Sequence, residues 1–239
     1  MIMNMTEDLN INAWLEEFRI KLIILFGDRL RFFGIQGSYG RDEPSADSDI
    51  DVVVIIDGMT HKDMFAYRKM IDDMEFSSKI CGFVSGTEEL AAWDKSDLLQ
   101  LFLDTRPIVG SLDSFGVSFT KEDIRSAVIA GACNLYHTCS HNLLHARSMY
   151  VLARLYKVAR FIVRMKYYYI TENYIAKFCK LADVVPDADK RVLKLAGMID
   201  NRCREEDFDG YSMILLDWAG DVIKLISRPL KRLLSTVIQ

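Results

Sequence analysis

The chain has 239 residues, of which 50% are hydrophobic and 27% charged, with only 4 prolines. This composition excludes a disordered tail, a collagen-like fibre and a small disulfide scaffold, and the length allows one large domain or two of modest size. The net charge of −4 is unevenly spread, because residues 1–120 carry 11 Lys and Arg against 21 Asp and Glu, whereas residues 121–239 carry 19 against 13. Opposite charge in the two halves indicates two parts with different roles.

Neither the cysteines nor the apolar segments indicate export or a membrane span. The 5 cysteines form no CxxC pair, which favours reduced thiols packed as small hydrophobic side chains. The longest strongly apolar runs, such as Val52–Ile56, are far shorter than the roughly 20 residues of a membrane-spanning helix. The opening residues lack an apolar stretch with a cleavage site, so we expect a cytoplasmic protein that contacts no membrane.

The first half of the chain predicts a mixture of helices and strands. Apolar residues from Ile11 to Leu25 recur at the spacing of one helix face, with Thr6 as the expected N-cap and Gly27 as the end. The continuous apolar run Ile50–Ile56 predicts a strand buried on both faces in the middle of a sheet. The other expected elements are a strand at Leu30–Gln36, a turn at Gly37–Gly40, a helix at His61–Met74, a strand at Lys79–Ser85, a helix capped by Thr87 that runs to Trp93, and an edge strand at Pro107–Gly110.

Beyond Thr120 the sequence predicts helices only. Thr120 is a helix cap followed by acidic residues, and the apolar residues from Met149 to Met165 keep helical spacing. Further helices are expected at Asn173–Ala182, Asp187–Asp200 and Tyr211–Ile226. The expected fold class is therefore α+β, with a small mixed sheet and its helices in residues 1–115 and an all-α helical bundle in residues 116–239.

The segment that leads into the central strand carries the chemistry. Because strand side chains alternate between faces, Asp49 and Asp51 point the same way, about 7 Å apart along the strand. Two neighbouring carboxylates repel each other unless a cation lies between them, and their oxygen atoms suit Mg²⁺. Upstream, Gly37 and Ser38 offer backbone N–H groups and a hydroxyl to a phosphate, and Arg41 can hold an anion through two hydrogen bonds. A phosphate cradle beside a carboxylate pair predicts phosphoryl or nucleotidyl transfer.

This segment, GSYGRDEPSADSDIDV, resembles the signature of the DNA polymerase β-type nucleotidyltransferase superfamily, in which a Gly-Ser turn precedes Asp-x-Asp or Asp-x-Glu at a strand start. Within the superfamily, the likeness is greatest to the minimal and antibiotic (kanamycin) nucleotidyltransferases, which also carry a helical C-terminal domain. The resemblance implies a nucleotidyltransferase domain that uses Mg²⁺ to transfer a nucleoside monophosphate from an NTP to a hydroxyl, with pyrophosphate leaving. It further implies phosphate contacts from Gly37, Ser38, Arg41 and Ser48, and a catalytic metal held by Asp49 and Asp51.

One position departs from the family pattern. The family usually has a third carboxylate on the next strand, but the corresponding strand here, Lys79–Ser85, contains no acid. Cys81 or Gly82 stands where Asp or Glu is expected. In the family this acid helps to hold the metal that activates the attacking hydroxyl. Two interpretations follow: an enzyme in which another group supplies this role, or a catalytically weak or inactive nucleotide-binding module with a regulatory, antitoxin-like role.

Four potential metal ligands recur every four residues on the first predicted helix of the second half: Cys133, His137, His141 and His145. They predict a transition-metal stripe or, more simply, a polar helix face. The resemblance offers a third interpretation, because the family has a general base on this helix. Aligning Asn134-Leu-Tyr-His137 with the Glu-Leu-Phe-Glu pattern of the family places His137 at that position, and a histidine titrates in the range that general-base catalysis requires.

The next helix interleaves basic and aromatic side chains. Arg154, Lys157, Arg160 and Arg164 alternate there with Tyr150, Tyr156 and Phe161, which predicts either nucleotide or nucleic-acid binding or a solvated basic face over an aromatic core. The positive charge of this half disfavours a polycationic acceptor. The expected partners are an NTP, with ATP favoured, an acceptor hydroxyl on a small molecule, nucleic acid or protein, and a second copy of the chain in a homodimer.

Overall fold

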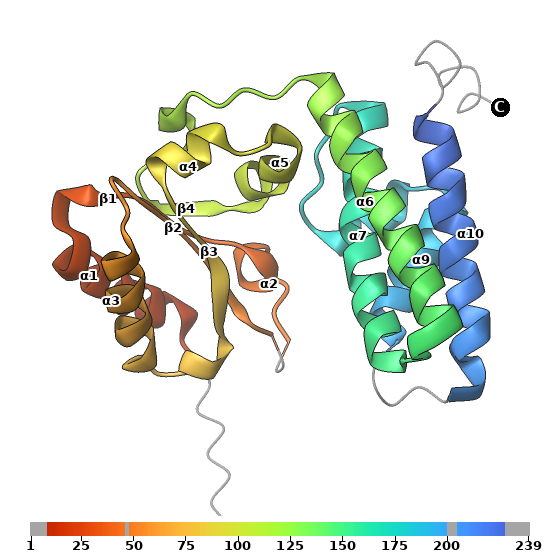
Figure 1. Ribbon diagram of the computed structural model, residues 1–239, viewed down its shortest axis with the longest axis horizontal. Helices are drawn as coiled ribbons and strands as arrows, with labels where there is room; N and C mark the ends of the chain where they lie inside the picture. The colour runs from red at the N-terminus through yellow and green to blue at the C-terminus, as the bar shows by residue number, and fades with distance from the viewer. Residues whose placement is uncertain (1–8, 46–47, 200–204, 228–239) are drawn as a thin grey trace, which may run out of the picture. The chain divides into compact units, whose positions relative to one another are not determined.

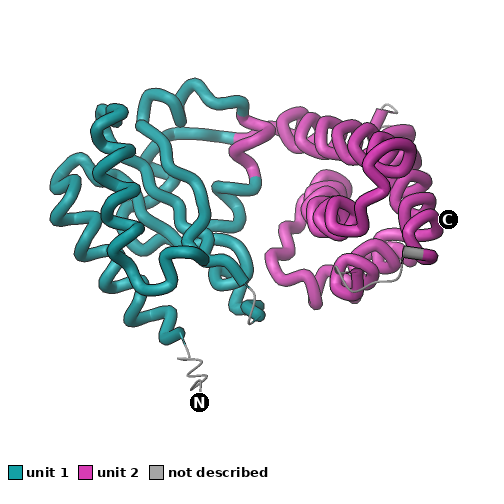
Figure 2. The backbone as a smooth tube through the Cα atoms, turned by 60° about the horizontal axis from the view of Figure 1, so that its bottom comes forward, with its two compact units in different colours: residues 1–94, 100–118 teal, residues 95–99, 119–239 magenta. Residues whose placement is uncertain are grey.

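The computed structural model describes residues 9–45, 48–199 and 205–227. The chain forms two compact units, which Figure 2 shows in separate colours. The first unit comprises residues 1–94 and 100–118, and the second comprises residues 95–99 and 119–239. Within the described part of the chain, every helix is too short or too polar to cross a membrane.

A four-stranded mixed sheet organises the first unit (Figure 1). The strand order is β3-β2-β1-β4, with β1 antiparallel to both β2 and β4, and β2 parallel to β3. The strands are β1 (Leu30–Ile35), β2 (Ile50–Ile56), β3 (Ile80–Gly86) and β4 (Arg106–Val109). The continuous apolar run therefore forms an internal strand and β4 an edge strand, as the sequence predicted. All residues of β2 are buried except Asp51, which is half-buried.

Helices α1 (Ile11–Phe26) and α3 (His61–Asp72) build the core of this unit with the sheet. The ring of Phe18 lies between Trp14, at 4.9 Å, and Phe33 of β1, at 5.3 Å between centroids. The indole N–H of Trp14 donates to the carbonyl oxygen of Glu75 at 2.9 Å, which ties the start of α1 to the segment after α3. These contacts hold α1 and the segment after α3 against the sheet.

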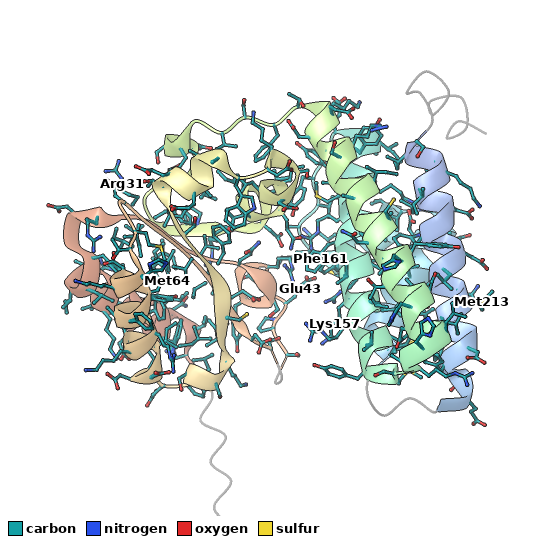
Figure 3. The ribbon with its side chains drawn as sticks, in the orientation of Figure 1. Arg31, Glu43, Met64, Lys157, Phe161 and Met213 are labelled. Carbon is teal, nitrogen blue, oxygen red and sulfur yellow. The ribbon has the colours of Figure 1, made fainter. Side chains whose placement is uncertain are left out.

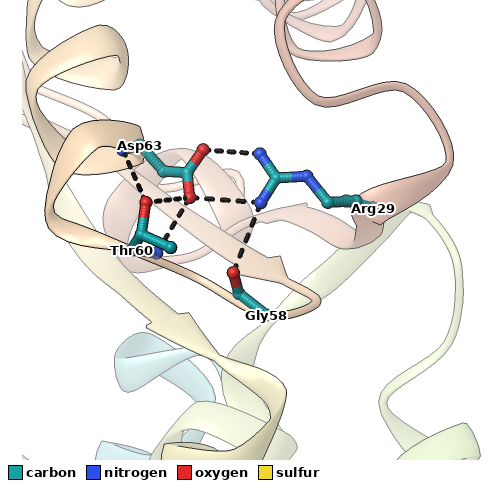
Figure 4. A network of polar contacts seen from close by, with 4 residues as sticks. All are labelled: Arg29, Gly58, Thr60 and Asp63. Carbon is teal, nitrogen blue, oxygen red and sulfur yellow. Dashed lines mark hydrogen bonds and ion pairs between the residues drawn. The ribbon is translucent and has the colours of Figure 1, made fainter.

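Asp63 fixes the start of α3 (Figure 4). Its carboxylate accepts hydrogen bonds from the backbone N–H and hydroxyl of Thr60, at 2.8 and 2.7 Å, and is paired with Arg29. The Arg29 guanidinium also donates to the carbonyl of Gly58 at 3.3 Å. Hydrogen bonds from Arg29 and Thr60 hold the pKa of the Asp63 carboxyl well below its usual range. The network joins the ends of β1 and β2 to the helix that follows.

Several boundaries in the first unit differ from expectation. Helix α1 is capped by Asn10, whose side chain accepts from the backbone N–H of Ala13; the expected cap, Thr6, lies outside the described residues. The segment Gly37–Gly40 is one helical turn, α2, rather than a simple turn. Helix α4 (Thr87–Ala92) begins after Gly86, and the Thr87 hydroxyl bonds Asp57 instead of capping the helix. The prediction missed α5 (Lys95–Asp104) altogether.

The described residues of the second unit contain helices and no strand, which confirms the all-α prediction. The main helices are α6 (Lys121–His141), α7 (Met149–Thr171), α8 (Phe178–Val184), α9 (Asp187–Met198) and α10 (Phe208–Ile226), with a π-helical turn at Asn142–Ala146. Thr120 caps α6 as predicted, together with Asp123. The expected helix Asn173–Ala182 was placed too early, because residues 173–177 are not helical. The predicted α+β fold class is confirmed.

Candidate functional site

The Gly-Ser motif lies directly against the strand that carries Asp51. The backbone N–H of Gln36, the residue before α2, donates to the Asp51 carbonyl at 2.7 Å. Gly37 follows with a φ of 68°, a conformation that favours glycine. A Cβ atom added to Gly37 would lie 1.9 Å from Oδ2 of Asp51, so no larger residue fits while that carboxylate keeps its position. The fold therefore places the Gly-Ser turn and the Asp51 carboxylate in contact.

The surroundings of Asp51 disfavour the ionised form of its carboxyl group. Burial raises the pKa of the Asp51 carboxyl above its ordinary value, and the negative charge of Asp49 raises it further, while the Arg41 guanidinium lowers it. Asp49 is exposed and lies just before β2. The placement of the two carboxylates on one face, expected from strand alternation, stays a prediction.

This pair of carboxylates has the chemistry of a divalent cation site, since a cation would relieve both burial and mutual repulsion. Across the described ranges, however, no three His, Cys, Asp or Glu side chains come together as a ready-made metal site. The protein would thus supply two carboxylates, and the remaining oxygen ligands would come from a nucleotide and from water.

The raised pKa makes a prediction about stability. The folded protein binds the Asp51 proton more tightly than the unfolded chain does, so the protonated carboxyl adds to the free energy of unfolding. This contribution is lost as the pH rises from the ordinary Asp range through the raised pKa. At neutral pH, Asp51→Asn should therefore be more stable than the wild type in the absence of metal, and the difference should shrink toward pH 3. Thermal unfolding in EDTA across this pH range measures it. A variant that is less stable than the wild type at pH 7 would contradict the prediction.

Arg41 is buried rather than open to solvent. Its guanidinium donates to Oδ2 of Asp104, the last residue of α5, at 2.6 Å, and lies 3.7 Å from the Glu43 carboxylate. The Arg41 and Asp104 side chains are 6% and 0% exposed, which makes this an interior ion pair that ties the Gly-Ser turn to α5. Sequence reasoning missed Asp104, and no local pattern marks it, because its partner lies 63 residues earlier in the chain. The phosphate contact expected of Arg41 stays a prediction.

Ser48 closes the loop between the two motifs. Its hydroxyl accepts from the backbone N–H of Ser45 at 2.8 Å and lies 3.1 Å from the Ser45 hydroxyl. Its own backbone N–H donates to the Ser45 carbonyl. These contacts give Ser48 a local structural role in the described structure. Its expected phosphate contact, like that of Ser38, stays a prediction.

The register of β2 and β3 decides which residue occupies the position of the third carboxylate. Asp51 pairs with Cys81 in the parallel ladder, and Val52 pairs with Gly82. Paired residues of neighbouring strands present their side chains to the same face, so Cys81 shares the face of Asp51. Gly82 has a φ of 139°, and a Cβ added to it would lie 1.9 Å from the Val52 carbonyl oxygen, inside the backbone of β2, so this position accepts no side chain. An exposed thiol, not the glycine, therefore stands beside Asp51.

The histidine-containing face of α6 gathers no metal site in the described structure. Cys133 and His137 are exposed on this helix, whereas His145 belongs to the π-helical turn beyond it. The rings of His141 and His145 are adjacent, with centroids 4.8 Å apart. The described structure therefore does not gather all four residues at one site, and the role of His137 as a general base stays a prediction.

The basic residues of α7 separate into two groups. The guanidinium of Arg164 is buried and packs over the ring of Phe178, 4.1 Å from its centroid, and donates to the Tyr174 hydroxyl at 3.0 Å. Arg160 also lies over the Phe178 ring, at 4.7 Å. Arg154 and Lys157 are exposed; Figure 3 labels Lys157 and Phe161 along α7. The predicted solvated basic face therefore fits only part of this stretch, because two arginines are used for packing.

The comparisons with known proteins agree with the motif. A family model described as a nucleotidyltransferase domain matches residues 11–128. No curated protein matched the chain. Among solved structures, the chain resembles spectinomycin adenyltransferase from Enterococcus faecialis, crystallised with ATP and spectinomycin, with a TM-score of 0.61 and 14% identity. The match covers 90% of this chain and 100% of that chain, and at this identity it shows a shared fold. Residues 11–128 therefore match the nucleotidyltransferase-domain family, in agreement with the DNA polymerase β-type signature that the motif resembles.

Proposed function

We propose that the protein transfers a nucleoside monophosphate from an NTP, with ATP favoured, to a hydroxyl group. The observation that carries this proposal is the contact between Gly37 and the Asp51 carboxylate, which joins a phosphate-binding turn to an acidic strand start. In this reaction the acceptor oxygen forms a bond to the α-phosphorus. The bond between the α-phosphorus and the oxygen that bridges the α- and β-phosphates breaks. Pyrophosphate leaves, and the hydroxyl proton passes to a base.

In the proposed site, the backbone N–H groups of Gly37 and Ser38 bind the departing phosphates, since a helical turn presents unpaired donors at its start. Asp49 and Asp51 hold Mg²⁺, which when bound supplies positive charge to the phosphate oxygens of the transition state. The Arg41–Asp104 ion pair attaches the Gly-Ser turn to α5. It also keeps the Arg41 guanidinium close enough to Asp51 to favour the ionised Asp51 carboxylate.

The acceptor is proposed to be a small molecule. The fold neighbour was crystallised with ATP and spectinomycin, and the match covers 90% of this chain and 100% of that chain. We propose that residues 1–115 act as the nucleotidyltransferase domain and that residues 116–239 shape the acceptor site of a cytoplasmic enzyme. The excess of Lys and Arg in residues 121–239 favours a neutral or anionic acceptor over a polycationic one.

A second candidate function is a nucleotide-binding module with little or no catalysis. The observation that favours it is the thiol of Cys81 at the position beside Asp51 where the family usually has a carboxylate. Without that acid, one metal ligand that activates the attacking hydroxyl has to come from elsewhere. The two candidates share NTP binding and differ in turnover.

The deciding experiment incubates the full chain with each α-³²P-labelled NTP, Mg²⁺ and a panel of neutral, anionic and polycationic hydroxyl compounds. Transfer of label to a neutral or anionic compound is the expected result. Saturable Mg²⁺-dependent NTP binding without transfer to any compound would support the regulatory module instead. The absence of both binding and transfer would contradict the proposed function, and efficient labelling of kanamycin would contradict the acceptor preference.

His137→Ala tests the proposed general base. Removal of a positioned base typically slows a reaction by about 10²–10⁴-fold. We therefore expect a loss of kcat in this range with unchanged NTP affinity, because His137 would contact the acceptor hydroxyl and not the nucleotide. His141→Ala, on the same face of α6, is the matched control and should keep its activity. Equal turnover in the wild type and His137→Ala would reject the assignment.

A further inference from the structure

A pocket of about 280 Å³ lies wholly within the second unit, between α7, α9 and α10. Its walls include apolar side chains of α9 and α10, among them Val192, Ile214 and Leu225. Three carboxylates also line it: Asp189 of α9, and Asp217 and Asp221 of α10. No part of the motif that defines the nucleotidyltransferase domain contributes to this pocket.

One wall of the pocket contains an incompletely satisfied buried carboxylate, that of Asp189. Asp189 is only 1% exposed, and its Oδ1 atom accepts from the Lys166 ammonium at 2.6 Å and from the indole N–H of Trp218 at 2.8 Å. The other oxygen, Oδ2, has no hydrogen-bond partner among the described residues. A buried carboxylate oxygen without a donor is costly, and native proteins rarely leave one unsatisfied without a ligand or water.

The surroundings of Asp189 select the chemistry of a ligand. Lys166 is paired with Asp189 at 2.6 Å and Lys224 with Asp221 at 3.3 Å, and the exposed Asp217 adds a third carboxylate to the lining. The ring of Trp218 lines the same pocket, with the Lys166 ammonium over it at 6.0 Å from the centroid. A hydrogen-bond donor with positive charge complements this lining, and an apolar body complements the remaining walls.

We propose that this pocket binds a small organic amine, with the ammonium group near Asp189 and an apolar body against Trp218, Val192 and Leu225. The proposal does not depend on nucleotidyl transfer, because each residue in it belongs to the helical unit. The unsatisfied Oδ2 atom is what distinguishes this pocket from an acidic surface patch.

Three probes with the same phenyl body test the ligand class: 2-phenylethylamine, 2-phenylethanol and phenylacetate. Binding to the full chain is measured by calorimetry and by the shift in unfolding temperature. We expect the amine to bind at least about tenfold more tightly than the alcohol, because an ionised donor makes the stronger hydrogen bond to a carboxylate. We expect no binding of phenylacetate. Equal binding of the three compounds, or no binding of the amine, would overturn the proposal.

Two kinds of variant assign the binding to this pocket. Asp189→Asn should lower the amine affinity about tenfold or more, because it removes the charge on the acceptor. Asp189→Asn also leaves the Lys166 ammonium without its counter-charge. Ala188→Phe therefore provides a second test, because it fills the pocket from an exposed position of α9 and leaves the Lys166–Asp189 ion pair intact. Ala146→Phe, at another exposed alanine that lies outside the pocket, is the control. Amine binding by Ala188→Phe at wild-type affinity would place the ligand elsewhere and refute the proposal.

Discussion

Asp51→Asn is expected to reduce nucleotidyl transfer by at least about 10³-fold, which corresponds to the several kcal/mol that a metal ion contributes to such a transition state. The Asp51 carboxylate touches the Gly-Ser turn, so it is the group that joins the metal to the phosphates in the proposed site. The amide of asparagine is a poor ligand for Mg²⁺ by comparison. Asp49→Asn, at the neighbouring position before β2, should show a similar loss.

The measurement is single-turnover transfer at saturating NTP, together with Mg²⁺ titration of NTP binding. Asp72→Asn, which removes an exposed carboxylate from α3, is the matched control and should behave as the wild type. The expected stabilisation of Asp51→Asn in the absence of metal separates loss of chemistry from loss of fold. Undiminished Mg²⁺-dependent transfer in both Asp49→Asn and Asp51→Asn would show that these carboxylates do not hold the catalytic metal.

Cys81→Asp is expected to increase the rate of transfer by about 10-fold to 10²-fold, because it adds a carboxylate on the face of β3 that Asp51 shares. The position is exposed, so the charged side chain carries little cost of burial. An added metal ligand should raise Mg²⁺ affinity as well as kcat. If the wild-type protein is a regulatory module without turnover, the same change should create measurable transfer.

Two controls isolate the effect of the new ligand. Cys179→Asp places a carboxylate at another exposed cysteine, on α8, and should leave the rate unchanged. Cys81→Asn changes size and polarity at the same position without charge and should not accelerate transfer. A Cys81→Asp protein that is slower than the wild type, or unchanged in both rate and Mg²⁺ affinity, would show that another group completes the site.

The sequence by itself determined the fold class and identified the segment that we propose as the nucleotide site. The run Ile50–Ile56 is apolar without alternation, and only an internal strand covered on both faces accommodates that pattern. The helices of the second half follow from periodic apolar residues and from local caps such as Thr120. The motif from Gly37 to Asp51 is informative because its chemistry depends on residues that are close in the chain.

Helix boundaries were less well determined, because several nearby residues can act as the cap and a candidate cap can bond a distant residue instead. Asn10 caps α1, and Thr87 bonds Asp57, a partner 30 residues away, instead of capping its own helix. Helix α5 was missed because its apolar residues form the nearly continuous run LLQLFL, which does not distinguish a short helix from a buried strand.

Only the tertiary structure decided the contacts that connect distant segments. The choice between Cys81 and Gly82 required the strand register, because a shift of one residue moves a side chain to the opposite face of the sheet. The partner of Arg41 is Asp104, and the partners of Asp189 come from α7 and α10, separations that no local pattern encodes. Packing around buried charges such as these excludes water from them. Their surroundings therefore depend on the whole fold and not on their neighbours in the sequence.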